Sequence, residues 1–103
     1  MQYDTRIALS FQALAHPRRV KIFRILAENP EAGRSFLSLQ QSSAMAQSSF
    51  THHVRVMERC GLINRRWHRG RVQYTLTPSA LHMALLEAGR LGKPKTSLRS
   101  RAA

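Results

Sequence analysis

The sequence predicts a mainly α-helical domain with one small β-hairpin. Apolar residues recur at helical spacing in five separate segments of the chain. One stretch, from Val72 to Leu76, instead alternates apolar and polar residues as a strand does. The chain has 103 residues, of which 43% are hydrophobic, so we expect one compact domain with a modest core.

The first two predicted helices meet at the pair His16-Pro17. Asp4 can cap the first helix, whose apolar face carries Ile7, Phe11 and Leu14. Proline suits the first turn of a helix, so the second helix begins at Pro17. Its broad apolar face continues until Asn29-Pro30 stops it.

A short helix and a longer helix follow. Ser35 can cap the short one, which has room for about two turns. The longer helix runs from about Gln47 to Cys60, and Gly61 suits its left-handed end. The face expected to meet the core carries Phe50, Val54 and Met57. The opposite face carries Ser48, His52, Arg55 and Arg59.

The hairpin and the last helix complete the chain. Residues 62–67 and 72–76 are the predicted strands, and residues 68–71, which include Gly70, are the turn. Thr77-Pro78 begins a helix that continues to Leu91 and has a wide apolar stripe. So wide a stripe indicates burial between subunits. We expect the first and last helices to form a dimer interface through Ile7, Phe11, Leu81, Leu85 and Ala88.

Charge points to a polyanionic partner. The chain holds 17 basic and 5 acidic residues, a formal net charge of +12. No acid lies between Glu58 and Glu87, an interval that contains five arginines. Arginine forms bidentate contacts with phosphate and guanine, so nucleic acid is the expected partner. We predict one domain over residues 1–91 and a basic, flexible tail over residues 92–103.

Several function classes are disfavoured. The one cysteine, Cys60, cannot form an intrachain disulfide or a thiolate metal cage. His52 and His53 are helix neighbours about 100° apart, so they cannot converge on one metal. No paired carboxylates, Ser/His/Asp set or glycine-rich phosphate loop is visible, so we expect no enzyme activity, no cofactor and no metal. Without an apolar run or a secretion signal, a cytoplasmic protein without a membrane partner is expected.

Two segments resemble the ArsR/SmtB family of winged helix-turn-helix repressors. FQALAHPRRVKIFRIL, residues 11–26, resembles that family's second-helix signature. QSSFTHHVRVMERCGLI, residues 47–63, resembles its recognition helix and the start of its wing, and the double histidine is the most specific part. With the hairpin, the resemblance covers roughly residues 5–91. It implies a winged helix-turn-helix fold with the terminal helices at a dimer interface.

The departures from the family pattern are informative. The third-helix positions that hold a cysteine pair in metal sensors correspond to Ser35 and Leu37, and the last helix offers only His82 and Glu87. The resemblance therefore implies a member without the usual metal sites. Ala44 stands at a turn position where glycine is usual, and a positive φ there would cost about 1 kcal/mol.

A short helix, a turn and a helix beginning Gln-Ser-Ser is the order of a helix-turn-helix, in which the second helix reads base edges. The residues expected to contact DNA from this recognition helix are Gln47, Ser48, Ser49, Thr51, His52 and Arg55. The wing residues expected at phosphates or in the minor groove are Arg65, Arg66, Arg69 and Arg71. We interpret His53 as a structural hydrogen-bonding residue and Trp67 as a packing residue at the wing root.

These observations predict a sequence-specific transcription regulator of double-stranded DNA, a homodimeric repressor that binds an inverted repeat. Two alternatives remain open. The first is a basic winged-helix protein that binds RNA, or nucleic acid without sequence preference. The second is an interaction module whose terminal helices bind a different protein. The sequence identifies neither the operator nor an inducing signal.

Overall fold

The computed structural model describes residues 2–94, which form five helices and three strands. The helices are α1 (Gln2–Ala13), α2 (Pro17–Ala27), α3 (Phe36–Ser43), α4 (Gln47–Arg59) and α5 (Ser79–Leu91). The strands are β1 (Arg34–Ser35), β2 (Ile63–His68) and β3 (Arg71–Leu76). The predicted mainly α-helical class with a hairpin is confirmed. Most of the tail predicted over residues 92–103 lies outside the described residues.

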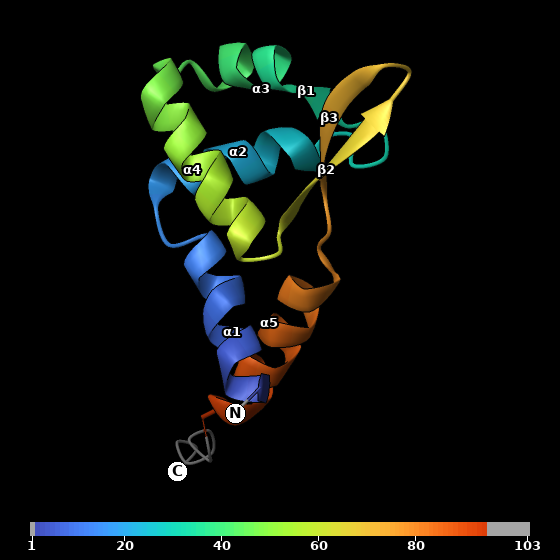
Figure 1. Ribbon diagram of the computed structural model, residues 1–103. Helices are drawn as coiled ribbons and strands as arrows, with labels where there is room; N and C mark the ends of the chain where they lie inside the picture. Colours follow the sequence, from blue (N-terminus) through green and yellow to red (C-terminus); the bar gives the residue numbers. More distant parts are fainter. Residues whose placement is uncertain (1, 95–103) are drawn as a thin grey trace.

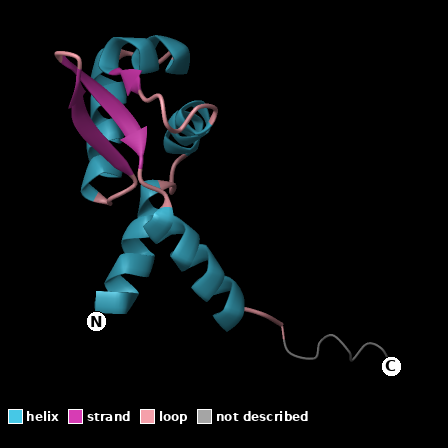
Figure 2. Ribbon diagram, turned by 90° about the vertical axis from the view of Figure 1, so that its right-hand side faces the viewer, coloured by secondary structure: helices cyan, strands magenta, loops and turns pink. Residues whose placement is uncertain are grey.

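The helices fall into two groups. Helices α2, α3 and α4 pack with the small sheet into one body, while α1 and α5 pack against each other and extend away from it (Figure 1). Turned by 90°, the pair diverges below the sheet (Figure 2). The two groups therefore present two separate surfaces, one made by α4 and the hairpin and one made by α1 and α5.

The sheet contains one strand more than the sequence predicted. Its order is β1-β3-β2 and all pairs are antiparallel. The added strand is two residues long, and Arg34 pairs with Tyr74. The β2–β3 turn has only two central residues, Arg69 and Gly70, with φ of 55° and 78°. Positive φ at both positions is the pattern of a type I′ turn, which matches the twist of the flanking strands.

The core lies where α2, α3 and α4 meet the sheet. Phe50, Ile22, Leu39 and Met57 are completely buried there. Phe50 and Met57, together with the buried Val54, form the face of α4 that the helical spacing predicted. Burial of this face leaves the opposite face of α4 to solvent.

Three residues at helix ends, one before α2, one after α3 and one before α4, have informative conformations or contacts. The His16 Nδ1 accepts a hydrogen bond from the backbone N–H of Arg18 at 3.0 Å and so caps α2. Ala44 ends α3 with φ of 59°, as the resemblance predicted for a glycine position, at a cost of about 1 kcal/mol. Ala46 precedes α4 without a side-chain cap, so the first amide groups of α4 remain open to an external acceptor.

Candidate nucleic-acid interface

Helices α3 and α4 are joined by a tight turn of residues 44–46. The backbone N–H of Ala44 donates to the Gln40 carbonyl at 3.0 Å, and the Gln40 side-chain amide donates to the Met45 carbonyl at 3.2 Å. Helix α2 packs against both α3 and α4. The arrangement fixes the angle between the two helices and holds α4 with its polar face outward.

The predicted recognition-helix residues occupy this outward face. Gln47, Ser48, His52 and Arg55 are exposed, and Ser49 and Thr51 are half-buried. Five of the six border one shallow hollow on α4, together with Arg59. The exception is Ser49, whose hydroxyl accepts a hydrogen bond from the Arg18 guanidinium at 3.4 Å. The structure thus brings five predicted residues together and gives the sixth a contact within the chain.

The four predicted wing arginines divide into two pairs. Arg65 forms an ion pair with Glu58 of α4, with 2.7 Å between Nε and Oε2. Arg66 donates to the backbone carbonyl of Glu31 at 3.1 Å. The side chains of Arg69 and Arg71 are exposed and form no hydrogen bond or ion pair with any of residues 2–94. Arg69 and Arg71 are therefore the guanidinium groups of the hairpin that are free to meet an external anion.

A second hollow joins α4 to the hairpin. Thr51, Arg55 and Arg59 line it from α4, and Arg65 and Tyr74 line it from the strands. Glu58 also borders it, but its carboxylate already faces Arg65. Of the predicted wing arginines, Arg65 therefore adjoins the predicted recognition-helix residues, in a hollow lined by three arginines.

Trp67 does not pack at the root of the hairpin, so that prediction is wrong. Its side chain is 73% exposed. It pairs with Val72, one step from the end of β2, which places it near the turn. The buried residues of the two long strands, Ile63, Tyr74 and Thr75, lie at the end of the hairpin away from the turn, whereas Trp67 lies near the turn.

No protein-family model matches the chain, and no curated protein matches it. Several solved structures do match the chain. HlyU from Vibrio cholerae is 28% identical, with a TM-score of 0.64 over 85% of this chain and 92% of that one. An ArsR-like transcriptional regulator from Rhodococcus sp. RHA1 is 23% identical, with a TM-score of 0.70 over 84% and 77%.

A third similar structure is the homodimeric winged helix-turn-helix DNA-binding domain of a possible ArsR-family transcriptional regulator from Mycobacterium bovis. It is 18% identical, with a TM-score of 0.64 over 91% of this chain and 85% of that one. This chain has the fold of the ArsR-family winged helix-turn-helix regulators. The resemblance predicted from the two sequence segments is confirmed at the level of the fold. In this fold α3 and α4 are the helix-turn-helix, and β2 and β3 are the wing.

The winged helix holds its recognition helix in place through a buried polar pair. His53 is 5% exposed, and its Nδ1 lies 3.2 Å from Nη1 of Arg19, which is 9% exposed. Because guanidinium only donates, the His53 ring is neutral and accepts at Nδ1. Arg19 also donates from Nη2 to the Gln12 carbonyl at 3.1 Å. The prediction that His53 is structural is confirmed, but the sequence did not identify Arg19 as its partner.

Electrostatics keeps this pair in one state. Burial lowers the pKa of His53, and the neighbouring His16, His52 and Arg19 lower it further. The ring of His16 lies 4.5 Å from that of His53, so the two rings form one contact between α2 and α4. The Arg19–His53 hydrogen bond and this ring contact together join α2 and its N-cap residue to α4.

Cys60 lies at the end of the recognition helix and is buried. Burial raises the pKa of its thiol, which outweighs the opposing effect of Arg19 and Arg59. A neutral buried thiol is a weak nucleophile, as expected of a cysteine that acts as a small hydrophobic residue.

The predicted dimer residues lie on α1 and α5 of the winged helix. Phe11 and Leu85 are exposed, and Ile7 and Ala88 are half-buried. Leu81 is only 5% exposed and packs within its own chain, so it is not free for a partner. Met83, Leu86 and Leu91, which belong to the wide apolar stripe predicted to be buried between subunits, are exposed side chains of α5 as well.

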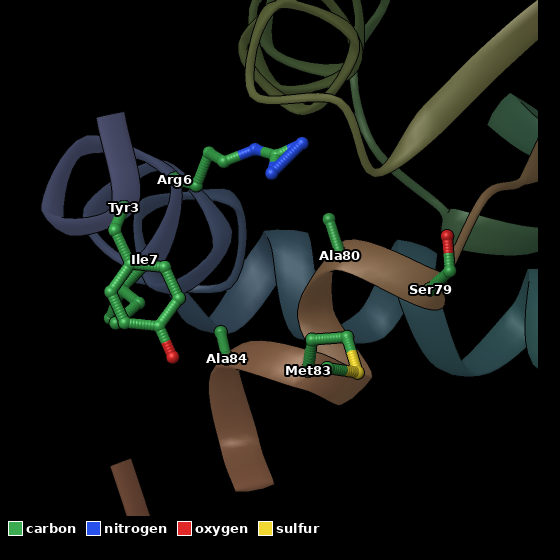
Figure 3. Close-up of a pocket in the computed structure, with 7 residues that line it drawn as sticks. All are labelled: Tyr3, Arg6, Ile7, Ser79, Ala80, Met83 and Ala84. Atoms are coloured by element: carbon green, nitrogen blue, oxygen red, sulfur yellow. The ribbon is translucent and has the colours of Figure 1, made fainter. Parts of the chain in front are cut away.

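A hollow of about 220 Å³ lies between parts of α1 and α5 (Figure 3). Tyr3, Arg6 and Ile7 line it from α1, and Ser79, Ala80, Met83 and Ala84 line it from α5.

Within residues 2–94, no three His, Cys, Asp or Glu side chains gather where a metal ion could bind. No helix in this range is long and apolar enough to cross a membrane.

Proposed function

We propose that the protein is a sequence-specific transcription regulator that binds double-stranded DNA as a homodimer. The observation that carries the proposal is the hollow between α4 and the wing, where Thr51 and Arg55 of the predicted recognition helix share one surface with Arg65 of the wing. The net charge of +12 favours such a surface on DNA. The fold of similar proteins, including one described as a homodimeric DNA-binding domain, supports the same assignment.

In the proposed complex, α4 enters the major groove and its N-terminal half meets base edges. Gln47 has the amide geometry for adenine, and Thr51 offers a methyl group to thymine. Arg55 lies one turn further along and can reach guanine or phosphate. Arg69 and Arg71 lie at the wing tip, where they reach phosphates or a narrow minor groove.

The dimer interface is proposed on α1 and α5. Phe11, Leu85 and Leu91 are exposed apolar side chains there, and clustered apolar side chains on a surface mark interaction sites. A two-fold dimer presents two recognition helices, so its site is an inverted repeat with half-sites about one helical turn apart. Repression needs only that the occupied site overlaps a promoter, whereas activation needs a further contact. We therefore propose a repressor, which acts as bound protein without enzymatic chemistry.

The test begins with selection of preferred duplexes from a random DNA pool, followed by salt titrations of each variant on a selected and a random duplex. Gln47→Ala or Thr51→Ala should weaken binding to the selected duplex by about 1 to 3 kcal/mol and leave binding to the random duplex unchanged. Arg71→Ala should weaken binding to both duplexes. It should also reduce by about 1 unit the salt slope, which is the slope of the logarithm of affinity against the logarithm of salt concentration. Identical behaviour of helix and wing variants would show that α4 does not read sequence.

Two controls complete the test. Duplex RNA of matched sequence should bind more weakly than the selected DNA at moderate salt, and equal binding would favour the RNA or nonspecific alternative. Sedimentation at micromolar concentration should give about twice the 11.7 kDa chain mass. A monodisperse monomer would contradict both the dimer and the inverted repeat.

A further inference from the structure

We propose that Trp67 is a DNA contact that places its indole ring in the minor groove beside the half-site read by α4. The inference rests on the proposed function and adds an apolar contact to the charged ones of the wing. A minor-groove contact of this kind would read the shape and flexibility of the flanking DNA.

Exposure is the first observation. Trp67 is the one tryptophan of the chain and the most exposed of the large hydrophobic residues in the described part of it. Burial of a tryptophan removes about 150–250 Å² of surface from water, so an exposed indole ring does not contribute this large stabilisation to the folded state. Large aromatic rings kept in water are common where a partner will cover them.

The strand register shows which way the ring faces. Arg65 pairs with Tyr74 and Trp67 pairs with Val72, so these two cross-strand pairs lie on the same face of the sheet. Arg65 on that face reaches Glu58 of α4. Trp67 therefore projects from the wing face that adjoins the recognition helix, one step nearer the tip.

Charge identifies the partner. The hairpin over residues 63–76 contains four arginines and no acid. A surface that covers Trp67 must therefore be anionic and must also offer flat apolar area. Deoxyribose edges and base steps lined by phosphates meet both requirements. The proposed dimer partner does not cover the ring, because α1 and α5 extend from the opposite end of the molecule (Figure 1).

The turn leaves few residues at the tip of the wing. Only Arg69 and Gly70 separate the two strands, and both adopt the positive φ of a type I′ turn. The minor groove is about 6 Å wide, and apolar side chains of other proteins enter it and part base steps. Trp67 lies two residues before the tip residue Arg69, so both side chains can enter together.

The lone tryptophan provides the test. Trp67 emission and its quenching by acrylamide are measured on the wild-type chain, with and without a saturating selected duplex. In parallel, the affinity for a fluorescein-labelled duplex is followed by anisotropy. We expect the bound duplex to protect Trp67 from acrylamide. Trp67→Ala should weaken the selected duplex by about 5- to 150-fold, the range seen for base–aromatic contacts.

The variants separate an apolar contact from a charged one. Trp67→Ala should leave the salt slope unchanged because it removes no charge, whereas Arg71→Ala should reduce it by about 1 unit. Trp67→Phe keeps an aromatic ring and should lose less than about 3-fold. Because the quenching experiment uses the wild-type chain, it remains decisive even if Trp67→Ala does not fold.

The outcomes distinguish the two proposals. Tight, selective DNA binding with Trp67 still open to acrylamide would overturn the Trp67 contact and leave the proposed function intact. Protection of Trp67 on random DNA without selectivity would support the contact and contradict sequence-specific regulation. Binding to no duplex would overturn both. Protection that rises with protein concentration alone would show instead that the wing contacts another copy of the chain.

Discussion

Replacement of His53 by phenylalanine tests how the recognition helix is held. The imidazole is almost fully buried, and its Nδ1 is the acceptor for Arg19 at 3.2 Å. A phenyl ring keeps similar volume but provides no acceptor. His53→Phe therefore leaves the Nη1 of Arg19 without its partner in a site where water does not reach it easily.

The expected cost follows from the kind of bond that is lost. A hydrogen bond with one charged partner contributes about 1.5–3 kcal/mol, more than a neutral bond. The Nε of Arg19 already has no partner among the described residues, while Nη2 keeps the Gln12 carbonyl. His53→Phe should therefore lower the free energy of unfolding by about 1.5–3 kcal/mol.

A double-mutant cycle measures the pair itself. Arg19→Met removes the guanidinium and retains a long apolar chain, and urea unfolding at 25 °C is compared among the wild type, both single variants and the double variant. Because the bond can be lost only once, the double variant should cost about 1.5–3 kcal/mol less than the sum of the single ones. Costs that add within about 0.5 kcal/mol would refute the coupling of α2 to α4 through this pair.

Three further predictions concern single sites. The pKa of His53 is lowered in the folded chain, so the unfolded chain binds more protons as the pH falls. The contribution of His53 to the free energy of unfolding is therefore complete above a pH of about 6.5. Below that pH it decreases by at most about 1.4 kcal/mol per pH unit. His53→Phe should remove that component from urea unfolding between pH 5 and 8, roughly the range where histidine titrates; an unchanged pH profile would contradict it. Ala44→Gly relieves a φ of 59° and should raise the free energy of unfolding by up to about 1 kcal/mol. A lower free energy of unfolding would show that the strain is absent. Glu58→Gln releases Arg65 and should strengthen binding to a random duplex, with a salt slope steeper by up to about 1 unit. The cost in stability should be small because the Arg65 side chain is 60% exposed to solvent. An unchanged slope would show that Arg65 does not reach DNA.

Periodicity predicted the helices well because burial imposes it. The spacing of Phe50, Val54 and Met57 identified the inner face of α4, and all three are buried. Strand β1 escaped prediction because two residues, Arg34 and Ser35, are too few for an alternation to appear. It forms only because β3 offers a free edge, and that is a property of the folded chain.

The candidate site was predicted in its residue types more than in its pairings. Helical spacing placed Leu81 on the same stripe as Leu85, but α5 turns Leu81 toward its own core. Composition showed arginines in the wing but not that Arg65 and Arg66 have partners within the chain. Such assignments depend on which side of a helix or strand its neighbours cover, and a single sequence does not carry that information.

The pairing of α1 with α5 has a consequence for synthesis on the ribosome. Helix α1 is made first, yet its packing partner is made last. About 65 residues separate the two helices, so at roughly 5–20 residues per second α1 waits about 3–13 s for α5. Strand β3, the last element of the intervening body, is made just before α5, so this body is completed only at the end of that interval. During that interval the face of α1 that packs on α5 is open to chaperones or to a neighbouring nascent chain.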